Sequence, residues 1–506
     1  MNLRSLQLNL MSNYIGSGYV IILTLVTIPY YLEILGAEAY GLIGFFTFLQ
    51  TALTMLDLGF NQFFGRQAAH AKGKHEGFVL LADLLKSLEV YFIALAFLLI
   101  AVSMPASSWM SVNWFSSNEI GSADIQKCLQ LMLANICIQM LVRLYRNGIL
   151  GFENQVWLNG ALIFISTFRF LGALLFIIFI SDNIVHFFIL QLFIVCLELA
   201  LLGFKFYHLL PAGLNLKFRF NLSTLGQNIP LAFSIAFTSF LWILTTQYDK
   251  FLLSKLLPLK EFGYFSLLAF AISGIVFIAV PIRQAIQPRL TFFIAQGKLK
   301  KSLSLYRQSS HYVSLLTGAF VVFLVFFAEP LFLGWTRDQQ ASQWVSQALY
   351  LFALGNWFLA MQSILVALQI ANGDLRIHLR ATTFFFIVQV PLIYWAAIEY
   401  GVIGVGITWL ALRIIFFLLV TPLIHKTFAK ELHLLWLFRD VLPVFSIQLI
   451  VGKSLSSLIT YQFISSSPYT ILILAGLGLT ILFSGILISN HTHSFLISKY
   501  NNWRVT

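Results

Sequence analysis

The sequence predicts an all-α polytopic membrane protein of about 14 transmembrane helices, with two parallel, pseudo-symmetric six-helix lobes around a central cavity and two further C-terminal helices. Three observations predict this class. Hydrophobic residues make up 59% of the chain and charged residues only 10%, and the mean hydropathy is +0.86, so lipid is its main solvent. About fourteen stretches are apolar and long enough to cross a bilayer. The two halves also resemble each other at a spacing of roughly 222 residues.

Hydropathy places the expected helices along the chain. Windows of about 20 apolar residues give spans near 9–33, 40–64, 87–105, 127–148, 158–180, 185–205, 226–248, 262–282, 310–333, 345–371, 381–399, 402–424, 441–463 and 469–489. Six spans form an N-terminal lobe over residues 1–220, six form a C-terminal lobe over 221–440, and two, with a cytoplasmic tail, occupy 441–506. The first span lacks a small-residue cleavage pattern, so we expect it to be retained.

Three short segments recur between the two halves. In the alignment of the two halves, Gly41 of a Tyr-Gly pair matches Gly263 of a Phe-Gly pair. The segment RNGILGFEN aligns with LQIANGDLR, so that Gly151 matches Gly373. A third pair, HAKGK and IAQGK, departs from that offset by two residues. One glycine at a helix end is expected for backbone reasons, but three matches in order indicate a repeat. Each half has six spans, so the repeats run parallel, with a substrate path expected between them.

The distribution of Lys and Arg predicts the orientation. With the N-terminus in the cytoplasm, most basic residues fall in inner loops, and the outer side carries only Lys127, Lys250, Lys255, Lys260 and Arg337. This asymmetry predicts cytoplasmic N- and C-termini. It also explains most of the formal net charge of +12, which therefore indicates topology and contact with anionic lipid headgroups, and no nucleic-acid partner is expected.

Several function classes lack their sequence signals. No Walker loop, dinucleotide fingerprint or nucleophile elbow occurs, so we expect no enzyme and no cofactor. The histidines are scattered, with His311, His425 and His433 assigned to loops, and no spacing predicts a metal site. The longest external loop, near 106–126, is short and contains only two acids. A membrane enzyme that builds polysaccharide usually carries its catalytic residues on a large external loop, so this loop favours a conduit.

Two segments carry a family resemblance. The first is PYYLEILGAEAYGLIGFFTFLQ followed by MLDLGFNQFFGRQAA, and the second is ANGDLRIHLRATTFFFIVQVPLIYWAAIEYGVIGVGITWLALR, from Ala371 to Arg413. Both resemble the O-antigen (Wzx-type) flippases of the multidrug/oligosaccharidyl-lipid/polysaccharide exporter superfamily. The resemblance extends to about residue 424, and the last two spans lie outside it.

This resemblance implies a protein of the bacterial inner membrane that moves an undecaprenyl-diphosphate-linked oligosaccharide from the cytoplasmic to the periplasmic leaflet. The substrate would be an O-antigen unit of lipopolysaccharide or a related polysaccharide unit. The implied partners are this lipid-linked substrate, the lipid bilayer and other polysaccharide-assembly membrane proteins. We expect a monomer.

A diphosphate and several sugar rings resist crossing hydrocarbon, so their carrier needs a wet, cationic cavity. Arg169 lies near the middle of the fifth span, Arg413 near the middle of the twelfth, and Lys453 a few turns into the thirteenth. An arginine at mid-membrane costs at least ~2.5 kcal/mol on insertion scales. We therefore predict that these residues line the cavity. The alternative is structural pairing of each arginine with an acid or carbonyl of a neighbouring helix, and Lys453 can instead snorkel to the interface.

Four more arginines lie at predicted inner helix ends. Arg143 and Arg146 share a helix face at the end of the fourth span, and Arg283 and Arg289 occupy the matching end of the eighth. Planar guanidinium forks suit a diphosphate, so the four are candidates for an entry patch. The alternative is that they only mark the cytoplasmic side, where basic residues accumulate in any case.

Acids within the spans are few. Asp57 in the second span and Glu198 in the sixth are candidates for ion coupling. Asp57 has an alternative role as a structural counter-ion, and Glu198, expected about two turns from the inner membrane edge, has the alternative of reaching the interface.

The sequence therefore predicts alternating access by two rocking lobes around a cationic cavity, and it leaves open whether an ion drives transport. Two alternatives remain. One is a multidrug or small-molecule antiporter of the same fold, and the positive bias of the charges within the spans counts against it. The other is a membrane polysaccharide polymerase or glycosyltransferase, and the absence of a large external loop counts against that.

Overall fold

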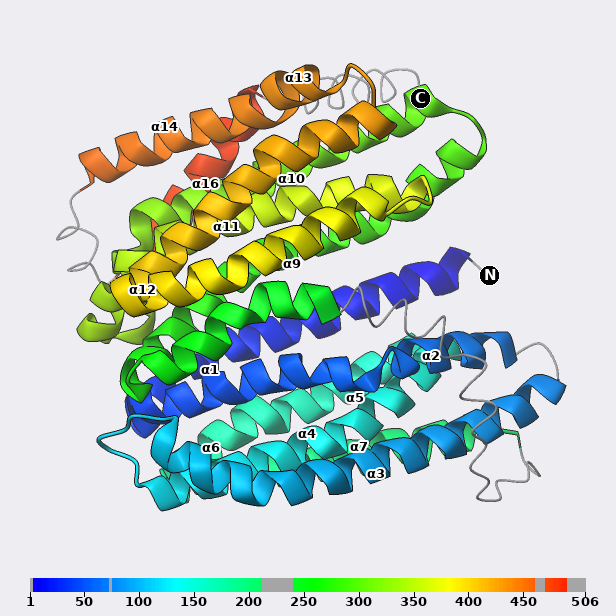
Figure 1. The fold of residues 1–506 in the computed structure, drawn as a ribbon, viewed down its shortest axis with the longest axis vertical. Helices are drawn as coiled ribbons and strands as arrows, with labels where there is room; N and C mark the ends of the chain where they lie inside the picture. Colours follow the sequence, from blue (N-terminus) through cyan, green and yellow to red (C-terminus); the bar gives the residue numbers. More distant parts are fainter. Residues whose placement is uncertain (1–2, 72–74, 212–239, 460–468, 489–506) are drawn as a thin grey trace. The chain divides into compact units, whose positions relative to one another are not determined.

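A computed structural model describes residues 3–71, 75–211, 240–459 and 469–488. These residues form long helices joined by short connections (Figure 1). The chain divides into two compact units, Met1–Gly263 and Tyr264–Thr506. The predicted lobe boundaries near residues 220 and 440 stay predictions, and residue 220 lies outside the described residues.

The first unit is built around α4, which packs against α2, α3 and α7, while α1 packs against α5, η2 and α6. Its elements are α1 (Leu3–Ala52), η1 (Leu53–Asp57), α2 (Phe60–Ala71), α3 (His75–Asn113), α4 (Ser122–Gly151), α5 (Gln155–Ser166), η2 (Thr167–Gly172), α6 (Ala173–Phe179), α7 (Ile184–Leu209), a helix over 240–256 and the start of α9 (Leu259–Ala295).

The second unit is built around α10 and α11, which pack against each other. α12 lies on α11, and the trailing helices α14 and α16 lie on α10 and on each other. The elements after α9 are α10 (Leu299–Thr336), α11 (Gln339–Ala371), α12 (Arg376–Phe428), α13 (His433–Leu435), η3 (Trp436–Val441), α14 (Leu442–Leu458) and α16 (Thr470–Ile488).

The all-helical membrane fold is confirmed. Eleven helices in the described part of the chain are long and apolar enough to cross a membrane. Two of them, α1 and α12, are interrupted at Gly36 (φ 84°) and Gly401 (φ 59°), where glycine tolerates the positive φ. Each interruption falls between two predicted spans. The seventh predicted span, 226–248, lies mostly outside the described residues, so the total of fourteen stays a prediction.

The second predicted span, 40–64, is not one continuous helix. After α1 the chain tightens into the 3₁₀ helix η1, and Leu58 and Gly59 adopt positive φ angles of 48° and 75° before α2 begins. The Asp57 carboxylate holds this turn, because it accepts hydrogen bonds from the Gly59 backbone N–H at 2.8 Å and from the Asn61 side-chain amide at 3.1 Å. The predicted span is therefore interrupted between Ala52 and Phe60, in a turn that Asp57 stabilises.

The predicted repeat is visible at the ends of α4 and α11, but two residues out of the expected register. The residue two places beyond each helix has a positive φ, which is 59° at Glu153 and 71° at Gly373. Glu153 N–H donates to the carbonyl of residue 150, and Gly373 N–H to that of residue 370. Gly373 therefore corresponds to Glu153, and the sequence match with Gly151 was wrong because it aligned glycines instead of backbone conformations.

The other matched glycines, Gly41 and Gly263, lie against each other. A Cβ atom on Gly41 would collide with the carbonyl oxygen of Leu259, and one on Gly263 would collide with that of Ala37. The start of α9 thus crosses α1 at backbone contact, which requires glycine on both helices.

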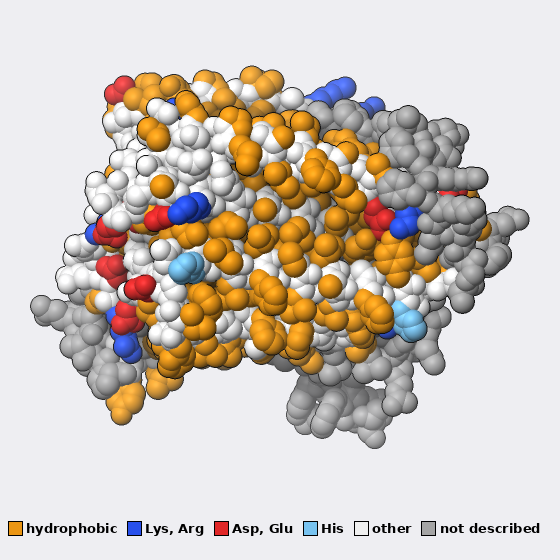
Figure 2. All heavy atoms as spheres, turned by 90° about the horizontal axis from the view of Figure 1, so that it is seen from below, with side chains coloured by type: hydrophobic (Ala, Val, Ile, Leu, Met, Phe, Trp, Pro, Cys, Tyr) orange, Lys and Arg blue, Asp and Glu red, His pale blue; other side chains and the backbone are white. Residues whose placement is uncertain are grey.

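Hydrophobic side chains cover the middle of the face drawn in Figure 2, and charged side chains gather toward its two ends. Large apolar residues of α3 and α7 are open to the surroundings, including Phe97 at 70%, Phe193 at 66% and Phe204 at 76% exposure. A soluble protein rarely exposes so much apolar surface. An apolar belt with charged ends is what a bilayer requires.

Candidate functional site

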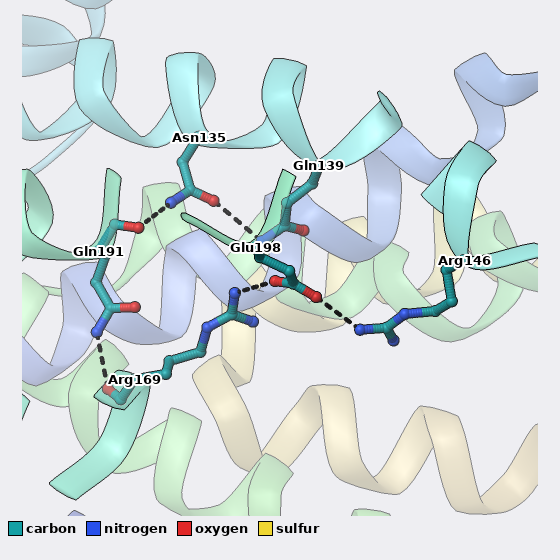
Figure 3. Close-up of polar contacts among 6 residues, drawn as sticks. All are labelled: Asn135, Gln139, Arg146, Arg169, Gln191 and Glu198. Atoms are coloured by element: carbon teal, nitrogen blue, oxygen red, sulfur yellow. Dashed lines mark hydrogen bonds and ion pairs between the residues drawn. The ribbon is translucent and has the colours of Figure 1, made fainter. Parts of the chain in front are cut away.

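A buried carboxylate joins two predicted site residues in the first unit. Glu198 lies near the middle of α7, and its side chain is only 5% exposed. Arg146 of α4 donates from Nη2 to Glu198 Oε1 at 2.7 Å, and Arg169 of η2 donates from Nη2 to Oε2 at 2.6 Å (Figure 3). The sequence singled out all three residues, and the structure brings them together.

α7 continues further beyond Glu198 than the sequence predicted. α7 continues for eleven residues after it, to Leu209, which is about 16 Å at 1.5 Å per residue. The expected position of Glu198, about two turns from the inner membrane edge, stays a prediction. The helix is longer at its C-terminal end than the hydropathy window, because the window stopped at the first basic residue.

Arg169 reaches Glu198 from a π-helical turn, η2. Such turns contain one extra residue and are frequent at functional sites. The carbonyl oxygen of Arg169 accepts a hydrogen bond from Gln191 Nε2 at 3.0 Å, and Gln191 is held in turn by Asn135, which donates to its carbonyl at 3.0 Å. Gln139 Nε2 donates to Asn135 Oδ1 at 3.0 Å (Figure 3). α4 and α7 together fix this side of the turn.

α1 fixes the opposite side of η2. Tyr31 donates to the carbonyl of Phe170 at 2.7 Å, and the hydroxyl groups of Tyr19 and Thr167 lie 2.8 Å apart. The carbonyl groups of Arg169 and Phe170 thus each accept a hydrogen bond from a side chain of a neighbouring helix. The backbone under Arg169 is held on both sides, so the direction of its side chain is well defined.

The site has more positive than negative charge. Arg143, one turn before Arg146, donates from Nη2 to the Gln50 carbonyl at 3.3 Å and interacts electrostatically with Asp57, Arg146 and Glu198. The side chains of Arg146 and Arg169 are 36% and 28% exposed, in contrast to the 5% of their shared acid. The acid is therefore enclosed, and the two arginine side chains remain partly exposed.

The second unit places Arg413 in a different environment. It lies in the half of α12 that follows Gly401, is 7% exposed, and its guanidinium carbon is 4.1 Å from the centre of the Trp409 ring. This is a cation–π arrangement with a residue one turn away on the same helix. Arg413 is therefore buried, and its predicted role in lining a cavity stays a prediction.

The remaining candidates occupy simpler positions. In α9, Arg283 is half-buried, with an Nε–H that has no hydrogen-bond partner in the described part of the chain, and Arg289 is exposed. Lys453 of α14 is exposed, as its snorkelling alternative expects. Asp57 caps the turn before α2, which favours its structural role. The entry patch of four arginines spans both units and stays a prediction.

A second charged cluster was missed by the sequence analysis. In the second unit, Asp440 of η3 is fully buried and accepts from Arg307 of α10 through Nε at 2.6 Å and Nη2 at 2.9 Å. The Asp440 carbonyl and His311 Nδ1 are 3.0 Å apart. The sequence contained a sign of this pair, because an acid such as Asp440 beside an apolar span needs a partner. The predicted span began one residue after Asp440 and so excluded it.

The assignment of His311, His425 and His433 to loops was wrong, because all three lie in helices, with His433 at the start of α13. His311 in α10 and His425 in α12 are each 1% exposed. His425 Nε2 lies 2.7 Å from the Tyr306 hydroxyl, and its Nδ1 lies 2.9 Å from Nδ1 of His433. These residues connect the ends of three helices by hydrogen bonds. Among the described residues, no group of His, Cys, Asp and Glu is arranged to hold a metal ion.

The family can now be stated. A family model described as "Polysaccharide biosynthesis protein" matches residues 8–293, which is more than half of the 506 residues. The chain belongs to this family. This assignment confirms the resemblance to polysaccharide exporters that the sequence segments carried. A second model, described as MatE, matches residues 234–395. No curated protein matches the chain.

Several solved structures share the fold of this chain over most of its length. One described as lipid II flippase MurJ, in an inward closed conformation, has a TM-score of 0.63 at 16% identity and covers 94% of this chain and 99% of its own. An inward-facing multidrug resistance MATE transporter of the MOP superfamily has a TM-score of 0.62 at 14% identity. The match covers 81% of this chain and 96% of that transporter. A MOP superfamily transporter from Pyrococcus furiosus, described as having a binding pocket of reverse polarity, has a TM-score of 0.53 at 16% identity. The match covers 83% of this chain and 95% of that transporter. The protein therefore has the MOP transporter fold.

Proposed function

We propose that the protein moves an undecaprenyl-diphosphate-linked oligosaccharide, an O-antigen or related unit, from the cytoplasmic to the periplasmic leaflet of the bacterial inner membrane by alternating access. The observation that carries this proposal is the excess of positive charge around Glu198. Arg143 and Arg146, in the last turns of α4, and Arg169, in η2, all interact with the buried Glu198, and a cation beside apolar helices is costly unless it has a function or a partner. A passing diphosphate supplies the negative charge that one glutamate does not.

Two lines of evidence support the substrate class. The chain belongs to a polysaccharide biosynthesis family, and the fold is shared with a protein described as a lipid II flippase over 94% of this chain. Lipid II is itself a lipid-linked sugar, so the same fold accommodates a substrate with a polar head and a lipid tail. The multidrug alternative shares the fold as well, but a site rich in arginine repels cationic drugs.

A deletion strain tests this function. We expect lipid-linked single repeat units to accumulate on the cytoplasmic leaflet, because glycosyltransferases continue to make them, and surface polysaccharide to disappear. Lipid extraction with leaflet-selective labelling of the sugar measures both. If single units reach the periplasm and only fail to polymerise, the protein is not the flippase and the polymerase alternative gains support.

The proposed orientation is tested separately with cysteine labelling. Asn118 and Gln339 are exposed residues on the side predicted to be periplasmic, and Lys300 is an exposed residue on the side predicted to be cytoplasmic. An impermeant thiol reagent added to intact cells should label cysteines at the first two positions and not at the third. Labelling of Lys300→Cys alone would reverse the orientation and with it the direction of transport.

A further inference from the structure

Glu198 makes an incomplete set of contacts with its two arginines. Each guanidinium group has five N–H donors in a planar fork that suits two parallel hydrogen bonds to one anion. Here each arginine gives only one bond to the carboxylate, through Nη2. Nε of Arg146 is buried and has no hydrogen-bond partner within the described residues. The arginines thus retain donors that a larger anion could use.

The charges of the site are also unbalanced. Glu198 contributes one negative charge to Arg146 and Arg169, and Arg143 adds a third positive charge on the α4 side. Asp57, the other acid that interacts with Arg143, already accepts two hydrogen bonds in its own turn. A diphosphate provides more oxygen acceptors and more charge than a carboxylate, and therefore matches the arginines better.

Access to the site is one-sided. The arginine side chains are 36% and 28% exposed, while Glu198 is 5% exposed. An incoming anion can therefore reach the arginine side chains more readily than the enclosed glutamate. Because η2 is held from both sides by Tyr31 and Gln191, Arg169 changes partner by rotating its side chain, without movement of the helix.

We propose that Glu198 is an internal substitute for the substrate's diphosphate, which displaces it from Arg146 and Arg169 when the headgroup binds. The identity of the anion rests on the proposed function, whereas the displacement does not. A buried carboxylate that loses its partners raises the free energy of the loaded state. The headgroup is consequently held weakly enough to leave on the other side, and the arginines keep a partner when the site is empty.

The test is binding of inorganic pyrophosphate to the purified full-length protein in detergent, measured by titration calorimetry. Glu198→Gln removes the competing charge and keeps the shape, so we expect pyrophosphate to bind at least about tenfold more tightly than to the wild type. Adding Arg169→Ala to that variant should cancel the gain. Asp374→Asn, a change of an acid to an amide in an exposed connection, is the matched control and should leave the affinity unchanged. Equal or weaker binding by folded Glu198→Gln protein overturns the proposal.

A second measurement uses the wild type and does not depend on the variant folding. Phenylglyoxal modifies accessible guanidinium groups, and mass spectrometry locates the modified residues. Pyrophosphate should slow modification of Arg146 and Arg169 several-fold and leave that of the exposed Arg376 unchanged. Failure to protect the first two overturns the proposal.

A third arm separates a lipid-linked diphosphate from a free one. Farnesyl diphosphate in the same micelles should bind more tightly than pyrophosphate if the substrate carries a lipid. Equal affinities, with the gain from Glu198→Gln still present, would assign the site to free diphosphates. That result would overturn the proposed flippase function and leave the role of Glu198 standing.

Discussion

Two π-helical turns each carry a charged residue into an ion pair, and the two pairs are built differently. In η2, Arg169 shares Glu198 with Arg146, and both arginines are partly exposed. In η3, the completely buried Asp440 carboxylate accepts two hydrogen bonds from one guanidinium group, that of Arg307. The second pair is complete and joins a trailing helix to α10. The first has more donors than acceptors, and it is the one that we propose receives a ligand.

The backbone of both turns is satisfied in a similar way. Side chains of Gln191 and Tyr31 donate to carbonyl groups of η2, and Ser314 donates to the Val441 carbonyl at the end of η3. The difference between the turns therefore lies in their charges and not in their backbone. A π turn by itself does not distinguish the two ion pairs, and our proposal for the η2 pair rests on its ratio of donors to acceptors.

The largest effect is expected from breaking the complete pair. Arg307→Ala leaves the Asp440 carboxylate buried without its main counter-ion, which should lower the free energy of unfolding by about 3–5 kcal/mol. We expect a lower melting temperature in detergent and a smaller amount of protein in the membrane, with export lost in proportion. Normal abundance with lost export would place this pair in the transport path and contradict the comparison.

The pair in η2 should respond differently to single and double changes. Arg169→Ala leaves Glu198 with Arg146, so the free energy of unfolding should fall by only about 1 kcal/mol while export is abolished at nearly normal abundance. The Arg146→Ala, Arg169→Ala double variant strands the carboxylate and should lose about 3–5 kcal/mol, more than the sum of the single changes. Adding Glu198→Gln should recover most of that loss. Full export by Arg169→Ala would remove the residue from the site.

Arg413 provides an intermediate case. Arg413→Lys keeps the charge and gives up the flat stacking on Trp409, so we expect a loss of about 0.5–1 kcal/mol in stability and partial export. Thermal unfolding and surface polysaccharide measure the two effects. Arg380→Lys, at an exposed position in the first turns of α12, is the control and should change neither. Unchanged export by Arg413→Lys would show that only the charge at this position matters.

The smallest effect is expected at an exposed pair. Hydrogen bonds from Arg376 lower the pKa of Asp374, between α11 and α12, to about 2. Since the folded pKa lies below the unfolded value of about 3.9, any stabilisation is present above that value and lost as the pH falls through the folded one. The Arg376 side chain is 77% exposed, so its contribution is small. Arg376→Ala should unfold at the same temperature as the wild type at pH 5 and at pH 8, and a clear decrease at either pH would contradict this.

Hydropathy was sufficient to predict the helical membrane fold, because a long apolar run has few other structures available to it. It also identified Arg169 and Glu198, since a charge inside such a run is conspicuous. The contact between them could not be predicted, because it depends on how α7 packs beside η2. The π turn could not be predicted either, since its residues, TFRFLG, fit an ordinary helix. Arg307 and Asp440 escaped notice because both lie at the edges of apolar windows, where charged residues are expected.

The π turn at η2 also has a consequence for how the site can be lost. Relative to an α-helix, such a turn is an insertion of one residue. Deleting one residue from Thr167–Gly172 would leave a helix that still crosses the membrane. It would, however, rotate the residues on one side of the deletion by about 100° relative to the other, turning either Arg169 or the residues of α6 away from their present neighbours. The arginine site therefore depends on the length of this segment as well as on its composition, and scanning by substitution alone would not detect that dependence.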